Sequence, residues 1–179
     1  KIIVTKYNDD SIEVEDFGRG CPVDYNQREK KYNWELVYCE LYAGGKYNNN
    51  SGDNYEYSLG LNGLGACATQ YSSEFMDVEV FRDGYKYDLH FEKGRNVGGL
   101  KKEETKQKKT GTKTHWRPDL EVFTDIKIEN EYLEDVLKKQ AVVNPNITFI
   151  LRIQRENNSF EEKTFYYENG IADYVAEIA

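Results

Sequence analysis

The sequence predicts an α+β fold in which a largely antiparallel β-sheet carries helices on one face. Two kinds of pattern lead to this prediction. Pairs of segments with apolar alternation flank short polar turns at several places in the 179 residues, which is typical of β-hairpins. Between these pairs lie segments with apolar residues at helical spacing. Strands mixed with helices, with several hairpins among them, favour an antiparallel sheet over a parallel one.

The first part of the chain is expected to form one hairpin and two helices. Asn8-Asp9-Asp10 supplies the hairpin turn, and Ala43-Gly44-Gly45 ends the first helix because glycine favours helix C-termini. A polar segment rich in Asn, Ser and Gly separates the two helices and is expected to be a loop. The expected elements are strands at 1–7 and 11–17, a helix at 34–42, the loop at 46–58 and a helix at 64–72.

The second part of the chain is expected to form two hairpins, a strand and two helices. Asp83-Gly84 is a strong hairpin signal, and Asn157-Asn158 marks the last turn. Tyr132, Leu133, Val136 and Leu137 would share the buried face of the longest helix. The expected elements are strands at 75–82 and 85–92, a loop at 94–109, a strand at 112–117 stopped by Pro118, a helix at 129–140, strands at 147–154 and 160–167, and a short helix at 170–179.

The composition excludes some classes of function. The net charge of -8 argues against DNA binding by this chain alone, since contacts with DNA phosphates need a basic face. The Lys-rich stretch at 93–113 is expected to be a solvated loop. Three scattered cysteines and two histidines give neither a disulfide framework nor a zinc site, so a cytoplasmic location is expected. No segment is apolar over a membrane-spanning length, and we expect no membrane partner.

Two glycine-bearing turns carry the candidate chemistry. The first, Asp16 to Pro22, offers a carboxylate that suits an exocyclic amine, beside Gly18 and Gly20, which let a flat ligand approach the backbone. The alternative for this turn alone is an ordinary strand end. The second turn, 59–65, offers unhindered amides ahead of a helix, which suit an anion such as phosphate. Its alternative is a plain loop, because it matches neither a Walker nor a Rossmann motif.

The joint arrangement is more specific than either turn. The chain contains, in order, D-F-G-R-G-C-P, Y-A-G-G-K-Y, N-Y-E-Y-S-L-G-L-N-G-L-G and T-G-T, followed by W-R-P-D-L-E-V-F and F-Y-Y-E-N-G. Over nearly its whole length it resembles the ATPase domain of the B-type subunits of bacterial type II DNA topoisomerases. Those subunits, of gyrase and topoisomerase IV, are GHKL ATPases. The resemblance implies a Bergerat two-layer sandwich at 1–179, with a mixed, mostly antiparallel sheet and helices on one face.

The resemblance also implies a nucleotide site. Asp16 would accept the adenine amino group, partly through a water that Thr112 shares, between a wall at Gly20, Cys21 and Pro22 and an apolar wall at Val37. Arg19 would flank the pocket, Tyr55 would reach adenine from a lid, and Lys46 would follow the Ala-Gly-Gly motif. The turn that cradles phosphate would comprise Gly60, Leu61, Asn62, Gly63, Leu64 and Gly65.

Some positions depart from the family pattern. Asn62 stands where histidine is usual, and Glu56 replaces a common lysine of the lid. Asp88 is matched to an arginine at the pocket rim, so weak binding of coumarin-type inhibitors is expected. Glu29/Asn33 and Glu92/Asn96 have the spacing of the family's general base and magnesium ligand, but both follow Asp16 and are interpreted as coincidence.

The implied cofactors are ATP and Mg²⁺. The chain begins at Lys1 within a predicted strand, so we expect a fragment whose general base and magnesium-binding asparagine lie upstream and which does not hydrolyse ATP alone. The implied partners are ATP or competing inhibitors and, for a full-length protein, the A-type subunit, a second B subunit and DNA. The alternatives are a catalytically inactive GHKL interaction module and another GHKL ATPase, of the mismatch-repair or chaperone type.

Overall fold

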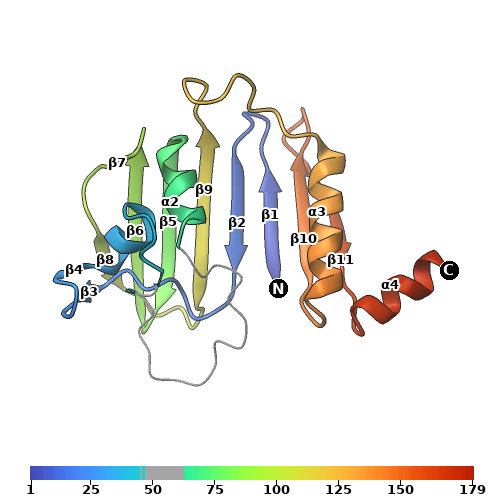
Figure 1. Ribbon diagram of the computed structural model, residues 1–179, viewed down its shortest axis with the longest axis horizontal. Coiled ribbons are helices and arrows are strands. Elements are labelled where there is room, and N and C mark those ends of the chain that lie inside the picture. The colour runs from blue at the N-terminus through green and yellow to red at the C-terminus, as the bar shows by residue number, and fades with distance from the viewer. Residues whose placement is uncertain (45, 47–62) are drawn as a thin grey trace.

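One twisted β-sheet with helices on one face makes up the fold (Figure 1). The computed structural model describes residues 1–44, 46 and 63–179. Within these residues the sheet has nine strands, in the order β11-β10-β1-β2-β9-β5-β6-β7, with β8 also paired to β6. All its pairings are antiparallel except the one between β1 and β10. The predicted α+β class with a mostly antiparallel sheet is therefore confirmed.

The elements follow the predicted order, with additions. The strands are β1 (Ile2–Lys6), β2 (Ile12–Asp16), β3 (Tyr25–Asn26), β4 (Lys31–Tyr32), β5 (Ser73–Arg82), β6 (Tyr85–Glu92), β7 (Arg95–Asn96), β8 (Lys101–Glu104), β9 (Gly111–Pro118), β10 (Phe149–Gln154) and β11 (Phe160–Phe165). The helices are α1 (Asn33–Tyr38), α2 (Gly65–Tyr71), α3 (Asn130–Val143) and α4 (Ile171–Ile178). Strands β3 and β4 form a separate two-stranded sheet.

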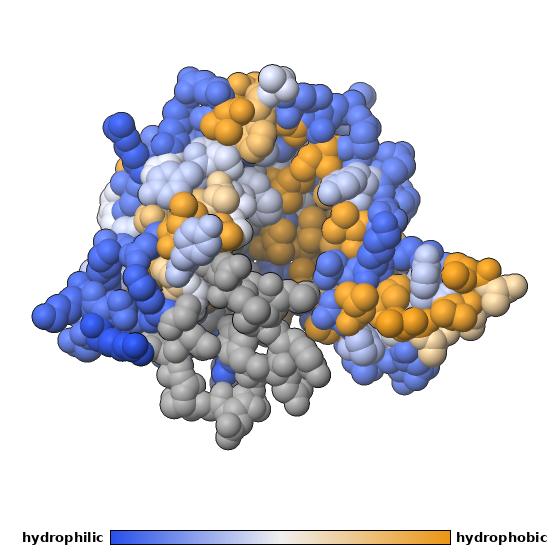
Figure 2. All heavy atoms as spheres, in the orientation of Figure 1, coloured by the Kyte–Doolittle hydropathy of each residue, from blue (hydrophilic) through white to orange (hydrophobic). Residues whose placement is uncertain are grey.

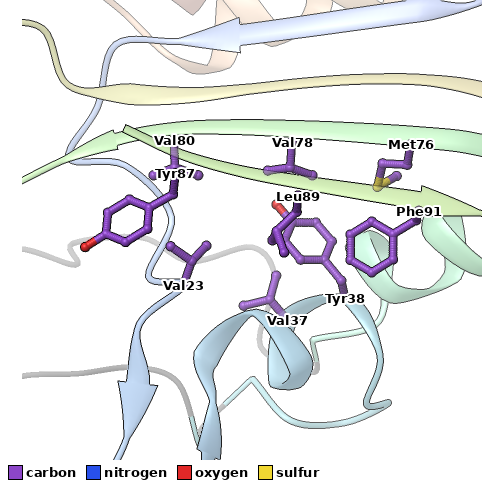
Figure 3. Close-up of a cluster of buried hydrophobic side chains, with 9 residues drawn as sticks. All are labelled: Val23, Val37, Tyr38, Met76, Val78, Val80, Tyr87, Leu89 and Phe91. Atoms are coloured by element: carbon purple, nitrogen blue, oxygen red, sulfur yellow. The ribbon is translucent and has the colours of Figure 1, made fainter. Parts of the chain in front are cut away.

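Strand alternation assigns one face of the sheet to the core. Val4, Val14, Thr114 and Val78 lie opposite one another on β1, β2, β9 and β5, and their side chains share the helix-bearing face. Two apolar clusters form on this face. Val37 and Tyr38 of α1 pack on β5 and β6 (Figure 3), and Leu137 and Ala141 of α3 pack on β1 and β10. Between the two groups of helices, Figure 2 shows a hollow lined by apolar surface.

The opposite face of the sheet carries charged side chains. Glu79 of β5 accepts hydrogen bonds from Lys86 of β6 at 3.0 Å and from Lys113 of β9 at 3.2 Å. Burial alone would raise the pKa of Glu79, but these two lysines hold it below its ordinary value. Cross-strand pairs of opposite charge stabilise the sheet while this face stays solvated. The sheet is therefore two-sided in chemistry, apolar under the helices and ionic on the other side.

Two boundary predictions were wrong. The first helix ends at Tyr38 rather than at residue 42, and Tyr42 has a φ of 59°, which a continuing helix does not permit. The segment 94–109, predicted as a loop, contains β7 and β8. Strand β8 pairs with β6 through complementary charges, with Lys101 opposite Asp88 and Glu103 opposite Lys86.

The predicted buried face of the longest helix is confirmed at Leu133 and Leu137, which pack in the cluster on β1 and β10, but not at Tyr132. Leu137, Ala141 and Val142 are its buried residues, whereas Tyr132 is 64% exposed. The helix starts one residue later and ends three residues later than predicted, which brings Ala141 and Val142 under β10. No helix among the described residues is long and apolar enough to cross a membrane.

Candidate nucleotide site

The turn that follows β2 holds the carboxylate singled out by the sequence. Asp16 is the last residue of β2, and its Oδ1 accepts a hydrogen bond from the Gly18 amide at 2.8 Å. This local bond fixes the carboxylate at the strand end. Its remaining lone pairs can accept from a ligand donor, because an ionised carboxylate has about four acceptor positions. Gly20 has a φ of 85°, and a Cβ there would lie 2.7 Å from the Phe81 carbonyl oxygen, so the close approach of the turn to β5 requires glycine.

Strand β9 brings Thr112 to the same turn. The Thr112 Oγ1 accepts a hydrogen bond from the Cys21 amide at 2.8 Å across 91 residues of sequence. Gly111, immediately before it, presses on the backbone of Asp16: a Cβ at Gly111 would lie 2.1 Å from the Asp16 carbonyl oxygen. Because the Thr112 oxygen accepts from Cys21, its own proton is left to donate to another group. Asp16, Cys21 and Thr112 thus come together as predicted, although the role of each in binding stays a prediction.

Helix α1 closes the floor of this cluster. Val37 and Tyr38 are both buried, and Cys21 packs against the same apolar group. The Tyr38 hydroxyl hydrogen-bonds with the Cys21 side chain and with Thr114, and burial raises the pKa of Tyr38 well above its ordinary value. Burial also raises the pKa of the Cys21 thiol to about 11. Both groups are therefore neutral at physiological pH, and Cys21 is not a reactive thiolate.

Tyr38 and Thr114 were missed by the sequence reasoning. Thr114 lies two residues after Thr112 on the same strand, so strand periodicity alone places both side chains on one face. That signal was available. For Tyr38 the helical spacing predicted only a position next to Val37, and nothing in the sequence indicated the contact with Cys21.

The assignment of Asp88 to the pocket rim was wrong. Asp88 lies on the ionic face, where it pairs with Lys86 at 3.2 Å, because Tyr87 and Leu89 on either side of it take the buried positions of β6. The structure brings Arg82, at the end of β5, to the glycine turn. Its Nη1 donates a hydrogen bond to the Gly20 carbonyl at 2.7 Å. The expectation of weak coumarin binding, which rested on Asp88, loses its basis.

Lys46 lies at the far end of the segment that follows α1. Its amide donates to the Ala43 carbonyl at 2.8 Å, its carbonyl accepts from Asn26 Nδ2 at 3.0 Å, and its Nζ lies 2.5 Å from Glu40 Oε1. Helix α2 is tied to this end of α1, since the Tyr71 hydroxyl donates to the Cys39 carbonyl at 3.2 Å. The elements that flank the predicted lid therefore lie beside α1.

Several predicted site residues lie at the edge of the described part of the chain or outside it. Gly63, Leu64 and Gly65 lead into α2, and Gly63 has a φ of 64°. Pro22 follows Cys21 and is partly buried, and Arg19 is exposed. The lid predictions at Tyr55, Glu56, Gly60, Leu61 and Asn62 fall outside the described residues.

The magnesium that the resemblance implies has no ligand set here. Among residues 1–44, 46 and 63–179, no group of three or more His, Cys, Asp or Glu side chains could hold a metal ion. Asn33 and Asn96, which have the family's spacing from a glutamate, are engaged in hydrogen bonds with Asp24 and with Gly99. The described residues therefore do not fit a metal site.

One cavity in the described part of the chain lies away from this turn. It has a volume of about 480 Å³ and lies on the ionic face, between Glu79, Asp88 and Lys113 of the sheet and the segment at 97–101. Three of its four carboxylates are already paired, Glu79 with two lysines, Asp88 with Lys86, and Asp77 with His90 at 2.6 Å. A much smaller hollow, lined among others by Glu15, Glu79 and Lys113, opens on the same ionic face, and its lining includes neither Cys21 nor Val37.

Known proteins resemble both the sequence and the fold. No family model matches the chain. It is 36% identical to the B subunit of DNA topoisomerase 4 from Escherichia coli K12 over 99% of its length, and 38% identical to the B subunit of DNA gyrase from Thermotoga maritima over 97%. This chain is a homologue of the B subunits of bacterial type II topoisomerases. It spans only 27% and 26% of those two relatives.

The structural comparison says which part of these relatives is matched. The 43K ATPase domain of Thermus thermophilus gyrase B, solved in complex with an aminocoumarin, superposes with a TM-score of 0.80 and 27% identity. The match covers 99% of this chain and 43% of that one. The homologue described here therefore has the GHKL fold of a gyrase B ATPase domain, and the predicted two-layer sandwich is confirmed.

Proposed function

We propose that this type II topoisomerase B homologue is an ATP-binding domain whose adenine site lies at the junction of β2, β9 and α1. The observation that carries the proposal is the hydrogen bond between the Cys21 amide and Thr112, which joins the Asp16 turn to β9. It brings a carboxylate acceptor and a hydroxyl donor to one glycine-bearing turn on the helix-bearing face of the sheet. Val37 and Tyr38 pack beside Cys21 and would give the adenine site the apolar floor that a flat purine needs.

Each residue of the proposed site has a separate task. The Asp16 carboxylate accepts from the adenine amino group, and a charge-assisted bond of this kind is stronger than a neutral one. The Thr112 hydroxyl donates to a ring nitrogen or to a bridging water. Gly20, Cys21 and Pro22 form one wall of the pocket and Val37 the other, with Arg19 at the rim. By the resemblance Tyr55 would reach adenine, and the turn at 60–65 would hold the phosphates. We assign Lys46 to the phosphates as well.

The activity of a longer parent protein is part of the proposal. By analogy with its relatives, that protein would couple ATP hydrolysis to passage of one DNA duplex through another, in the cytoplasm, with an A-type subunit, a second copy of the B-type chain and DNA as partners. The described residues hold no metal site, so no step through magnesium is assigned to them. The unit at 1–179 is proposed as a single ATPase domain that binds nucleotide.

Calorimetry with a non-hydrolysable ATP analogue tests the proposal. The wild-type chain is expected to bind, and Asp16→Ala is expected to lose about 1.5–3 kcal/mol, the value of a hydrogen bond to a charged group. Asp125→Ala is the matched control, because Asp125 Oδ1 also accepts from a backbone amide two residues on, that of Lys127 at 2.9 Å. Equal affinity of wild type and Asp16→Ala would refute the role given to the carboxylate.

A further inference from the structure

Three charged side chains, those of Lys31, Glu40 and Lys46, form a triad. Glu40 lies just after α1, its Oε1 is 2.5 Å from the Lys46 ammonium, and its Oε2 is 3.0 Å from the Lys31 ammonium. Both carboxylate oxygens are thus engaged by a cation. The side chains of Lys31 and Lys46 are 53% and 46% exposed, whereas that of Glu40 is 28% exposed. The two lysines are therefore open to solvent and to a ligand, with Glu40 behind them.

The backbone around Lys46 is fixed independently of this ion pair. Its amide and carbonyl are bonded to Ala43 and Asn26, and Asn26 is itself bonded to the fully buried Asn33 at 3.0 Å. Loss of Glu40 would consequently release the Lys46 ammonium without releasing its backbone. The position of the triad also matters, since Glu40 follows Tyr38 of the proposed site by two residues.

We propose that Glu40 lowers the affinity of the site for phosphate-bearing nucleotides by holding the Lys46 ammonium in an internal ion pair that a bound phosphate has to break. The inference rests on the proposed function of the site, in which Lys46 contacts phosphate. Glu40 acts through Lys46 and is a positioning residue. Because Lys31 also pairs with the Glu40 carboxylate, it weakens the ion pair between Glu40 and Lys46.

The proposal has a specific signature. Because the competition concerns charge, the effect of Glu40 has to grow with the number of phosphates on the ligand and disappear with adenosine. It also has to vanish when Lys46 is absent. A merely structural role of Glu40 would instead alter all ligands alike, through the position of α1 and its floor residues Val37 and Tyr38.

Glu40→Gln, assayed by calorimetry at low ionic strength, tests this. We expect about two- to fivefold tighter binding of a non-hydrolysable ATP analogue, the range of an exposed ion pair, a smaller gain for ADP and none for adenosine. Glu134→Gln is the matched control, because the Glu134 side chain is also 28% exposed and pairs with Lys163 at 2.6 Å. It should leave all three affinities unchanged. In a Lys46→Met background, Glu40→Gln should give no gain.

The outcomes separate the inference from the proposed function. If wild type binds the ATP analogue and Glu40→Gln binds it equally or more weakly, the inference is wrong and the proposed function stands. An equal gain for adenosine would also overturn the inference. If only Glu40→Gln binds the analogue, the inference is supported in its strongest form. If neither chain binds, both the function and the inference are wrong.

Discussion

Replacement of Thr112 by valine isolates the hydrogen bond that joins the Asp16 turn to β9. Valine has nearly the shape of threonine, so packing is kept while the acceptor of the Cys21 amide at 2.8 Å is removed. A buried N–H left without a partner costs about 1–3 kcal/mol, and the lower half of that range is expected because the bond is only partly buried. For a chain of this length that corresponds to a fall in Tm of about 2–8 °C.

Urea denaturation and nucleotide binding together test this reasoning. Thr112→Val is expected to unfold at lower urea with an unchanged m value, and its affinity for the ATP analogue should fall as well. Thr112→Ser keeps the oxygen and should recover most of both losses. A Thr112→Val chain with wild-type stability would show that the Cys21 amide finds another acceptor. In that case the turn is not held by β9, and the argument for a shared site fails.

Two further predictions concern the backbone of the site and the ionic face. Gly111→Ala should lower the free energy of unfolding by about 2–5 kcal/mol, because the new Cβ would lie 2.1 Å from the Asp16 carbonyl oxygen and the residue has a φ of 138°. Urea titration measures this loss, and unchanged stability would contradict the prediction. Hydrogen bonds to Glu92 and Asp77 raise the pKa of His90. The contribution of protonated His90 to the free energy of unfolding is therefore complete below about pH 6.5 and is lost as the pH rises through the folded-state pKa. Between pH 6 and 8 the free energy of unfolding of the wild type should therefore fall by about 0.2–1 kcal/mol more than that of His90→Gln, which is the value of a surface ion pair. Thermal melts of both chains across this pH range measure the difference, and parallel pH profiles would contradict the prediction.

Local patterns in the sequence predicted the hairpins well. The strands expected at 75–82 and 85–92 are β5 and β6 to within two residues, because alternation and the Asp83-Gly84 turn are both local signals. Strand β8 could not be found in this way. Its four residues, Lys101 to Glu104, are all exposed and charged, and what makes them a strand is their pairing with β6, which presents an opposite charge at two of the four positions. That information lies in another part of the chain.

The error at Asp88 has a different cause. Strand alternation was sufficient to place it, since Tyr87 and Leu89 occupy the apolar positions of β6 and Asp88 between them must face the other way. The match to a family position overrode that local argument. Arg82, which is bonded to Gly20, has the position at the glycine turn that had been assigned to Asp88. A family match therefore has to agree with strand phase before it assigns a side chain to a site.

Strand phase also explains why the site lies where it does. On β2, Ile12 and Val14 face the helices, so the next residue in phase is Asp16; on β9, Thr112 and Thr114 lie in phase with each other on that same face. A carboxylate and two hydroxyls thus occupy positions that the pattern reserves for apolar side chains. Polar residues in a core position need partners. Cys21 and Tyr38 supply two of those partners, and the acceptor capacity left on Asp16 is what a ligand donor would use. The sequence positions that break the apolar pattern of a sheet face are consequently the ones to test first for binding.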